Sequence, residues 1–152
     1  MAFEQLKLSN QLCFPIYAAS RLITREYQPH LEKLGITYPQ YLVLMVLWET
    51  DGITVHDIST KLILNTNTLT PLLKRMASMD IITRKRSDAD ERKVVISLTG
   101  KGKEMRVNAA RLPEELMHGL QKGGLSVNQL TELRTNLNVL LDFLTQKAKS
   151  KE

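Results

Sequence analysis

The chain has 152 residues and a formal net charge of +5 at pH 7, with 43% hydrophobic and 24% charged residues. This length suits one domain with its own core, and the hydrophobic content argues against intrinsic disorder. The longest apolar run, Tyr41 to Trp48, is far too short to span a bilayer, and no secretory signal opens the chain. A single cysteine excludes an internal disulfide and suits a reducing compartment. We therefore expect a cytoplasmic protein without membrane contact.

The excess positive charge lies entirely in residues 74–106, which hold ten basic and five acidic residues. The rest of the chain holds eleven of each sign. A basic patch of this kind attracts a polyanion such as nucleic acid, because neutralised phosphates release counterions. A solvated basic face without a partner has the same composition, so charge alone leaves both interpretations open.

The first predicted element is a helix over residues 9–34, in which apolar residues recur at spacings of three and four. Pro15 predicts either a late helix start or a local kink, and Pro29 predicts a break before the last turn. The sequence Thr37-Tyr38-Pro39-Gln40 is typical of a helix N-terminus. The helix that it begins extends to about Thr50 and is apolar nearly all round, so we expect it to be buried.

Two shorter helices are predicted next, over residues 55–62 and 67–79, with Thr54 as the N-cap of the first. A tight polar turn at residues 64–66 joins them. The inner face of the second helix consists of Leu69, Leu72, Leu73 and Met76. Two short helices joined in this way after a buried helix predict a helix-turn-helix.

The period then changes from helical to alternating. Residues 81–86 and 93–98 predict two strands, and the polar residues 87–92 form the turn between them. This is a β-hairpin with a charged tip. A helix-turn-helix followed by such a hairpin is a winged helix.

The pattern after Thr99 predicts a helix that resumes after Pro113, and Gly123-Gly124 marks a break. A capping box at Ser126 predicts a last helix to about Lys147. These helices are long relative to the core that they could cover in one chain. We therefore expect them to pack, with the N-terminal helix, against a second copy of the chain.

The expected fold class is thus mainly α with a small β-hairpin wing, a winged helix-turn-helix with dimerisation helices at both ends. Residues 1–36 would form an N-terminal segment for dimerisation and sensing. Residues 37–99 would form the winged helix-turn-helix DNA-binding domain, and residues 100–152 the C-terminal dimerisation helices.

The stretch from Asp90 to Thr99, DERKVVISLT, resembles the wing signature of the MarR family of dimeric winged-helix regulators. Four further segments resemble the single-cysteine members of the OhrR-type organic hydroperoxide sensors: residues 11–14, 17–21, 37–41 and 68–76. The chain departs from this pattern at Asn65-Thr66-Asn67, where close relatives carry Asp-Ser-Gly. That departure bears on the choice of bases and leaves the fold unchanged.

Cys13 is the residue for which a chemical role is expected. By itself, a free cysteine between Leu12 and Phe14 is more often a small buried hydrophobe. Its place near a helix N-terminus favours the thiolate, and Tyr17 lies one turn further on the same face. A phenol that donates a hydrogen bond to sulfur stabilises the anion. The resemblance assigns this role to tyrosines around Cys13: Tyr27 and Tyr38 of the partner subunit, with Tyr17 nearby.

The resemblance implies a dimeric repressor that binds a pseudo-palindromic double-stranded operator and releases it when an organic hydroperoxide oxidises Cys13. Without a second cysteine, the sulfenic acid would form a mixed disulfide with a low-molecular-weight thiol, form a sulfenamide or overoxidise. No cofactor is expected, and the protein is not expected to be an enzyme. Two alternatives stay open: a MarR-type repressor that a small aromatic ligand releases, and a thiol peroxidase that uses Cys13.

The predicted helix over residues 67–79 is expected to enter the major groove of DNA. The resemblance also implies that Arg92 inserts into the minor groove and that Asp90 holds its direction. The full set of expected DNA contacts is Thr66, Asn67, Thr68, Thr70, Lys74, Arg75, Arg84, Lys85, Arg86, Asp90 and Arg92. A solvated strand face remains the other interpretation of residues 84–86. No metal site is expected, because the histidines (His30, His56 and His118) are not at ligand spacing.

Overall fold

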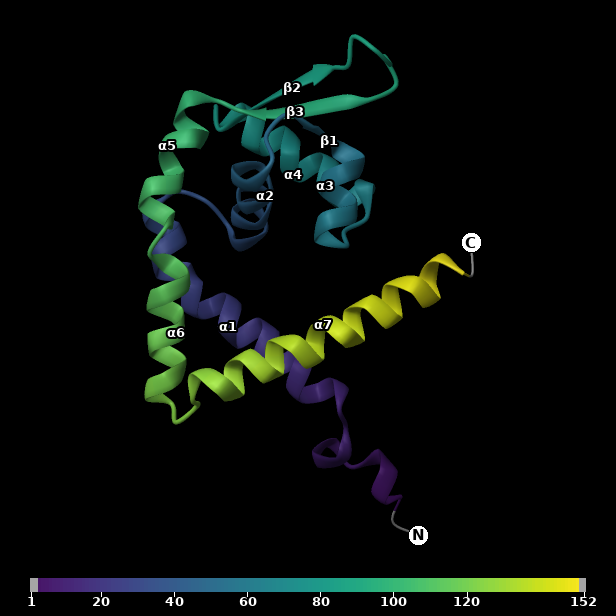
Figure 1. Cartoon of the computed structure of the whole chain (residues 1–152), viewed down its shortest axis with the longest axis vertical. Coiled ribbons are helices and arrows are strands. Elements are labelled where there is room, and N and C mark those ends of the chain that lie inside the picture. Colours follow the sequence, from purple (N-terminus) through teal and green to yellow (C-terminus); the bar gives the residue numbers. More distant parts are fainter. Residues whose placement is uncertain (1–2, 151–152) are drawn as a thin grey trace.

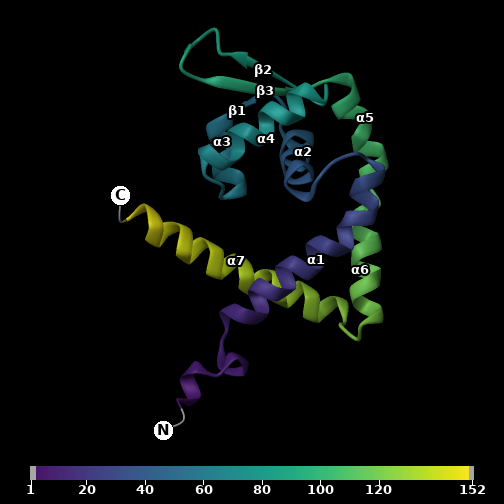
Figure 2. The same ribbon diagram turned by 180° about the vertical axis from the view of Figure 1, so that it is seen from behind.

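The computed structural model describes residues 3–150, apart from the side chain of Lys149. Helices α2, α3 and α4 and a small sheet form a unit at one end, and α5 and α6 lead away from it (Figure 1). Helix α7 and the N-terminal segment extend outward at the other end, as the reverse view in Figure 2 also shows. In chain order the elements are η1 (Glu4–Leu6), η2 (Leu8–Asn10), α1 (Cys13–Lys33), α2 (Tyr38–Glu49), β1 (Ile53–Thr54), α3 (Val55–Leu62), α4 (Thr66–Ser78), β2 (Ile82–Arg86), β3 (Val94–Leu98), α5 (Gly100–Ala109), α6 (Leu112–Lys122) and α7 (Val127–Lys149).

The sheet is antiparallel with strand order β1-β3-β2, so the predicted winged helix is confirmed. The expectation of a two-stranded hairpin was incomplete, because β1 adds a third strand. Gly52 turns the chain with a φ of +71°, and Ile53 and Thr54 then pair with Ile96 and Val95. Two residues are too few to show strand alternation in a sequence, so only the pairing partner reveals this strand.

The core lies where α2, α3 and α4 meet the inner face of the sheet. Burial of α2 is confirmed, and the inner face of α4 is buried except for the partly exposed Leu72. Each fully buried large apolar side chain contributes about 1.5–3 kcal/mol relative to an exposed one. The core side chains that are at most 2% exposed in this unit are Tyr41, Val43, Leu44, Leu47, Ile58, Leu69, Leu73, Met76, Ile81, Ile82 and Ile96.

The prolines of the first predicted helix behave differently from one another. Helix α1 starts late, at Cys13, which places Pro15 in the first turn, where its missing N–H costs no intrahelical bond. The predicted break at Pro29 is wrong, because α1 continues through this residue to Lys33. Pro29 removes the bond from its own nitrogen, yet the helix continues for four further residues. Beyond it, buried Leu31 anchors the last turn, and its carbonyl accepts the N–H of Ile36 at 3.1 Å.

Helix α7 starts where the capping box predicts it. Ser126 accepts the backbone N–H of Gln129 at 3.2 Å, and the Gln129 side chain accepts that of Ser126 at 2.9 Å. None of the described side chains of α7 is buried. Among residues 3–150, no helix is both long and apolar enough to cross a membrane.

Candidate nucleic-acid interface and cysteine site

The start of α4 presents three polar side chains to solvent. Asn65 is the N-cap, and its side chain accepts the N–H of Asn67 at 2.8 Å. Thr66, Asn67 and Thr68 are exposed, whereas Leu69 is fully buried. Burial of the apolar face therefore fixes α4 while its N-terminal turn stays free to meet a ligand.

The basic residues after this turn are divided between α4 and β2. Lys74 and Arg75 are exposed on α4, one turn beyond the half-buried Thr70. Lys85 and Arg86 are exposed on β2. Exposed basic side chains on two adjacent elements form a surface that can bind successive phosphates of a nucleic-acid backbone.

Arg84 lies on the inner face of the wing, where it pairs across the sheet with the buried Ile96. Its Nε atom is buried and has no hydrogen-bond partner among the described residues. An unpaired buried donor costs about 1–3 kcal/mol. Arg84 is only partly exposed, unlike Lys85 and Arg86 beside it.

At the tip of the wing, Asp90 and Arg92 form the expected pair. Arg92 Nε donates to Asp90 Oδ1 at 3.1 Å, and the Arg92 backbone N–H donates to the same oxygen at 3.1 Å. The side-chain and then the backbone hydrogen bond from Arg92 lower the pKa of the Asp90 carboxyl below its ordinary value. The Arg92 side chain is 91% exposed, so a fixed carboxylate directs an otherwise free guanidinium outward.

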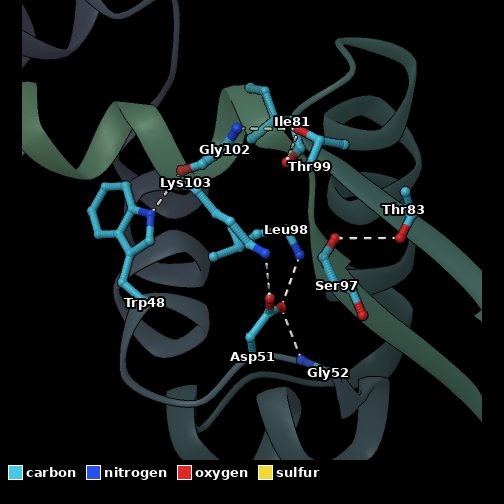
Figure 3. Close-up of polar contacts among 10 residues, drawn as sticks. All are labelled: Trp48, Asp51, Gly52, Ile81, Thr83, Ser97, Leu98, Thr99, Gly102 and Lys103. Carbon is cyan, nitrogen blue, oxygen red and sulfur yellow. Dashed lines mark hydrogen bonds and ion pairs between the residues drawn. The ribbon is translucent and has the colours of Figure 1, made fainter.

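The base of the wing holds a polar network that the sequence did not reveal (Figure 3). Trp48 Nε1 donates to the Gly102 carbonyl at 2.8 Å. The Thr99 hydroxyl donates to the Ile81 carbonyl and accepts the Gly102 N–H at 3.1 Å. Asp51 accepts the backbone N–H of Leu98 at 2.8 Å. The N-cap position of Thr99 could be predicted, but the distant partners of Trp48 and Asp51 leave no local signal.

Cys13 is the first residue of α1, and it is exposed. Its neighbours Leu12, Phe14 and Ile16 are exposed apolar residues. The interpretation of Cys13 as a core residue is therefore wrong for the single chain. Tyr17, one turn away, is 63% exposed.

Tyr27, Tyr38 and Tyr41 form a cluster at the junction of α1 and α2. Their ring centroids lie 5.1 Å (Tyr27–Tyr38), 5.8 Å (Tyr27–Tyr41) and 6.2 Å (Tyr38–Tyr41) apart. Burial, together with the neighbouring Tyr38 and Tyr41, raises the pKa of Tyr27 to about 12, and burial also raises the pKa of Tyr38 and Tyr41. These phenols therefore keep their protons at physiological pH and remain hydrogen-bond donors.

One chain does not bring Cys13 to these tyrosines. Cys13 and Tyr27 are fourteen residues apart on the same helix, which corresponds to about 21 Å along its axis. Contact between them requires a second chain. Among residues 3–150, no three His, Cys, Asp or Glu side chains gather as metal ligands.

Fold and exposed basic elements together define a winged-helix transcriptional regulator. The family model for the transcriptional regulators SarA/Rot matches residues 25–108. The organic hydroperoxide resistance transcriptional regulator of Bacillus subtilis is 48% identical over 145 residues, 95% of this chain and 97% of that protein. The chain therefore belongs to the SarA/Rot family of transcriptional regulators, and the 48% identity confirms the resemblance to the organic hydroperoxide sensors.

Solved structures agree with this assignment. The structure of reduced AbfR bound to DNA is 35% identical, with a TM-score of 0.75, over 93% of this chain and 97% of that one. An E. coli MarR variant shares the fold with a TM-score of 0.68 at 24% identity, over 86% of this chain and 96% of that one.

Proposed function

We propose that this chain is a dimeric cytoplasmic repressor that binds operator DNA and releases it when an organic hydroperoxide oxidises Cys13. The observation that carries the proposal is the exposure of Cys13 at the start of α1, among exposed apolar side chains. The similarity to a regulator of organic hydroperoxide resistance and to a DNA-bound regulator supports it.

DNA contact would involve α4 and the wing of each subunit. The exposed turn Thr66 to Thr68 would meet base edges in the major groove, and Arg92 would enter the adjacent minor groove. The exposed Lys85 and Arg86 of β2 would contact phosphates beside it. In a two-fold symmetric dimer, the two α4 helices would lie about one DNA turn apart, or ~34 Å, and would read a pseudo-palindromic operator.

The dimer would complete the sensing site. Apolar side chains that one chain leaves exposed, such as Leu8 and Phe14 near Cys13 and Phe143 on α7, would be buried between two copies. A crossing of the two α1 helices would bring Tyr27 and Tyr38 of the partner subunit to Cys13. Their protonated phenols would then donate hydrogen bonds to the thiolate.

Oxidation would proceed by attack of the Cys13 thiolate on the hydroperoxide. A sulfur–oxygen bond forms as the oxygen–oxygen bond breaks, and the departing alkoxide takes a proton and leaves as an alcohol. The sulfur loses two electrons and becomes a sulfenic acid. A low-molecular-weight thiol then condenses with it to a mixed disulfide, releasing water. Each event uses one Cys13 thiolate and one hydroperoxide and needs no cofactor, so the oxidation is stoichiometric as long as no further thiol regenerates Cys13.

The modified Cys13 would disturb the dimer. A sulfenic acid accepts the tyrosine hydrogen bonds less well than a thiolate, and a mixed disulfide adds bulk beside them. The α1 helices would shift, and the two α4 helices would leave the spacing that the operator requires.

The test is operator binding by the purified dimer before and after one equivalent of cumene hydroperoxide and a small thiol, with Cys13→Ser alongside. Release of the wild type and retention of Cys13→Ser support the proposal. If both stay bound, Cys13 is not the sensor and a small aromatic ligand becomes the better inducer. In the single chain, an open groove of about 550 Å³ beside Tyr41, Met45 and Trp48 is a candidate place for such a ligand. In a separate assay with excess peroxide and thiol, consumption of many equivalents of peroxide per Cys13 would instead indicate a thiol peroxidase.

A further inference from the structure

Asp51 joins the end of α2 to the end of β3 (Figure 3). Its Oδ1 atom accepts the backbone N–H of Leu98 at 2.8 Å and that of Gly52 at 2.9 Å. Its Oδ2 atom lies 4.0 Å from Lys103 Nζ on α5. One carboxylate therefore contacts α5, β3 and the turn before β1.

The sheet itself provides no backbone acceptor for the N–H of Leu98. Strand β1 pairs with β3 only at Ile96 and Val95, so the ladder on that side ends before Leu98. The next N–H along the chain, that of Thr99, bonds to the Ile81 carbonyl on the β2 side. The N–H of Leu98 faces the opposite side, where no strand continues, and Asp51 supplies the acceptor.

The contact between Asp51 and Leu98 lies at the base of the wing, far from its tip. From Leu98 to Val94 strand β3 extends over about 13 Å at the rise of a strand, and Arg92 lies two residues further, in the turn. A rotation of about 10° at the base would move the far end of β3 by about 2.3 Å, which is enough to break a hydrogen bond at the tip. The orientation of the wing relative to α4 therefore depends on how firmly its base is held.

We propose that Asp51 is a positioning residue that sets the angle of the wing and, through it, the contact of Arg92 with DNA. This inference rests on the proposed DNA binding. It predicts a change in operator affinity opposite in direction to the change expected from charge alone. Loss of an acidic residue by itself favours binding to phosphates, whereas loss of the Asp51 carboxylate weakens operator binding.

The experiment measures operator affinity at fixed salt for Asp51→Ala, Asp51→Asn, Arg92→Ala and the double variant Asp51→Ala with Arg92→Ala. Asp51→Ala lowers affinity by about tenfold, close to the effect of Arg92→Ala. Asp51→Asn, which loses the charge and keeps an acceptor oxygen, retains wild-type affinity. The double variant binds little worse than Arg92→Ala alone, because both changes remove the same contact.

Asp88, an exposed acidic residue of the wing tip, provides the matched control. Asp88→Ala removes the same charge without touching the base of the wing, so its affinity stays equal or rises. If Asp51→Ala does not fold, Asp51→Glu moves the carboxylate by one methylene and lowers affinity in its place.

Three results would overturn the inference while leaving the proposed function standing: wild-type affinity in both Asp51→Ala and Asp51→Glu, equal losses in Asp51→Asn and Asp51→Ala, or full additivity with Arg92→Ala. Absence of any operator binding by the wild type would overturn the proposed function and this inference with it.

Discussion

Gly102 lies where the first turn of α5 passes closest to the start of the wing. A Cβ atom at this position would lie far inside van der Waals contact with the Ile81 carbonyl oxygen and 3.1 Å from Leu98 Cδ2. The carbonyl belongs to the backbone, so no side-chain rotation relieves the clash. Gly102→Ala would therefore force α5 and the base of the wing apart by about 1 Å.

The expected loss follows from three contributions. Overpacking of this kind costs about 1–3 kcal/mol. Strain on the hydrogen bond from Trp48 to the Gly102 carbonyl, which is 2.8 Å long, adds about 1 kcal/mol. The better helix propensity of alanine offsets about 1 kcal/mol. We expect the free energy of unfolding to fall by about 1–3 kcal/mol, a large share of a typical total of roughly 5–15 kcal/mol.

Urea unfolding at one fixed protomer concentration measures this loss, because the stability of a dimer depends on concentration. Gly100→Ala is the matched control, since Gly100 opens the same helix and a Cβ there meets nothing within 4 Å. Its stability should equal or slightly exceed that of the wild type. A Gly102→Ala protein as stable as Gly100→Ala would refute the reasoning.

Three other predictions concern DNA binding, the tyrosine cluster and the dimer. Arg92→Ala should weaken operator binding about tenfold or more, and equal affinities of Arg92→Ala and wild type would contradict the wing assignment. Lys85→Ala should weaken operator binding only mildly, and the affinity should then depend less steeply on salt concentration. Ultraviolet titration should place the pKa of Tyr27 near 12, against 10.0 for a free phenol. The folded chain then holds this proton more tightly than the unfolded chain, so the free energy of unfolding should fall as pH rises from about 10 to 12, and this fall should be smaller in Tyr27→Phe. Replacing Leu141 and Leu144, which are 46% and 49% exposed on one face of α7, by glutamate should yield monomers in sedimentation, whereas an intact dimer would exclude this face from the interface.

Much of the fold could be predicted from the sequence because its signals are local. N-cap residues such as Thr54 and Ser126 satisfy backbone donors within three residues of themselves, and helical spacing identifies the buried face of α4. The charged tip between two alternating segments likewise identified the wing, with Asp90 and Arg92 only two residues apart.

The features that could not be predicted from the sequence depend on contacts between residues distant in the chain. Strand β1 exists because Ile53 meets Ile96, and α1 continues past Pro29 because Leu31 is buried against the core. Asp51 reaches across 47 residues to Leu98, and Arg84 keeps an unpaired buried donor beside Ile96. Local sequence was enough to predict most helices, the hairpin of the wing and the place where positive charge gathers, because hydrogen bonding and amphipathic spacing act within a few residues. Only the folded chain shows how the wing is anchored and how Tyr27, Tyr38 and Tyr41 come together, because packing between segments distant in the sequence determines both.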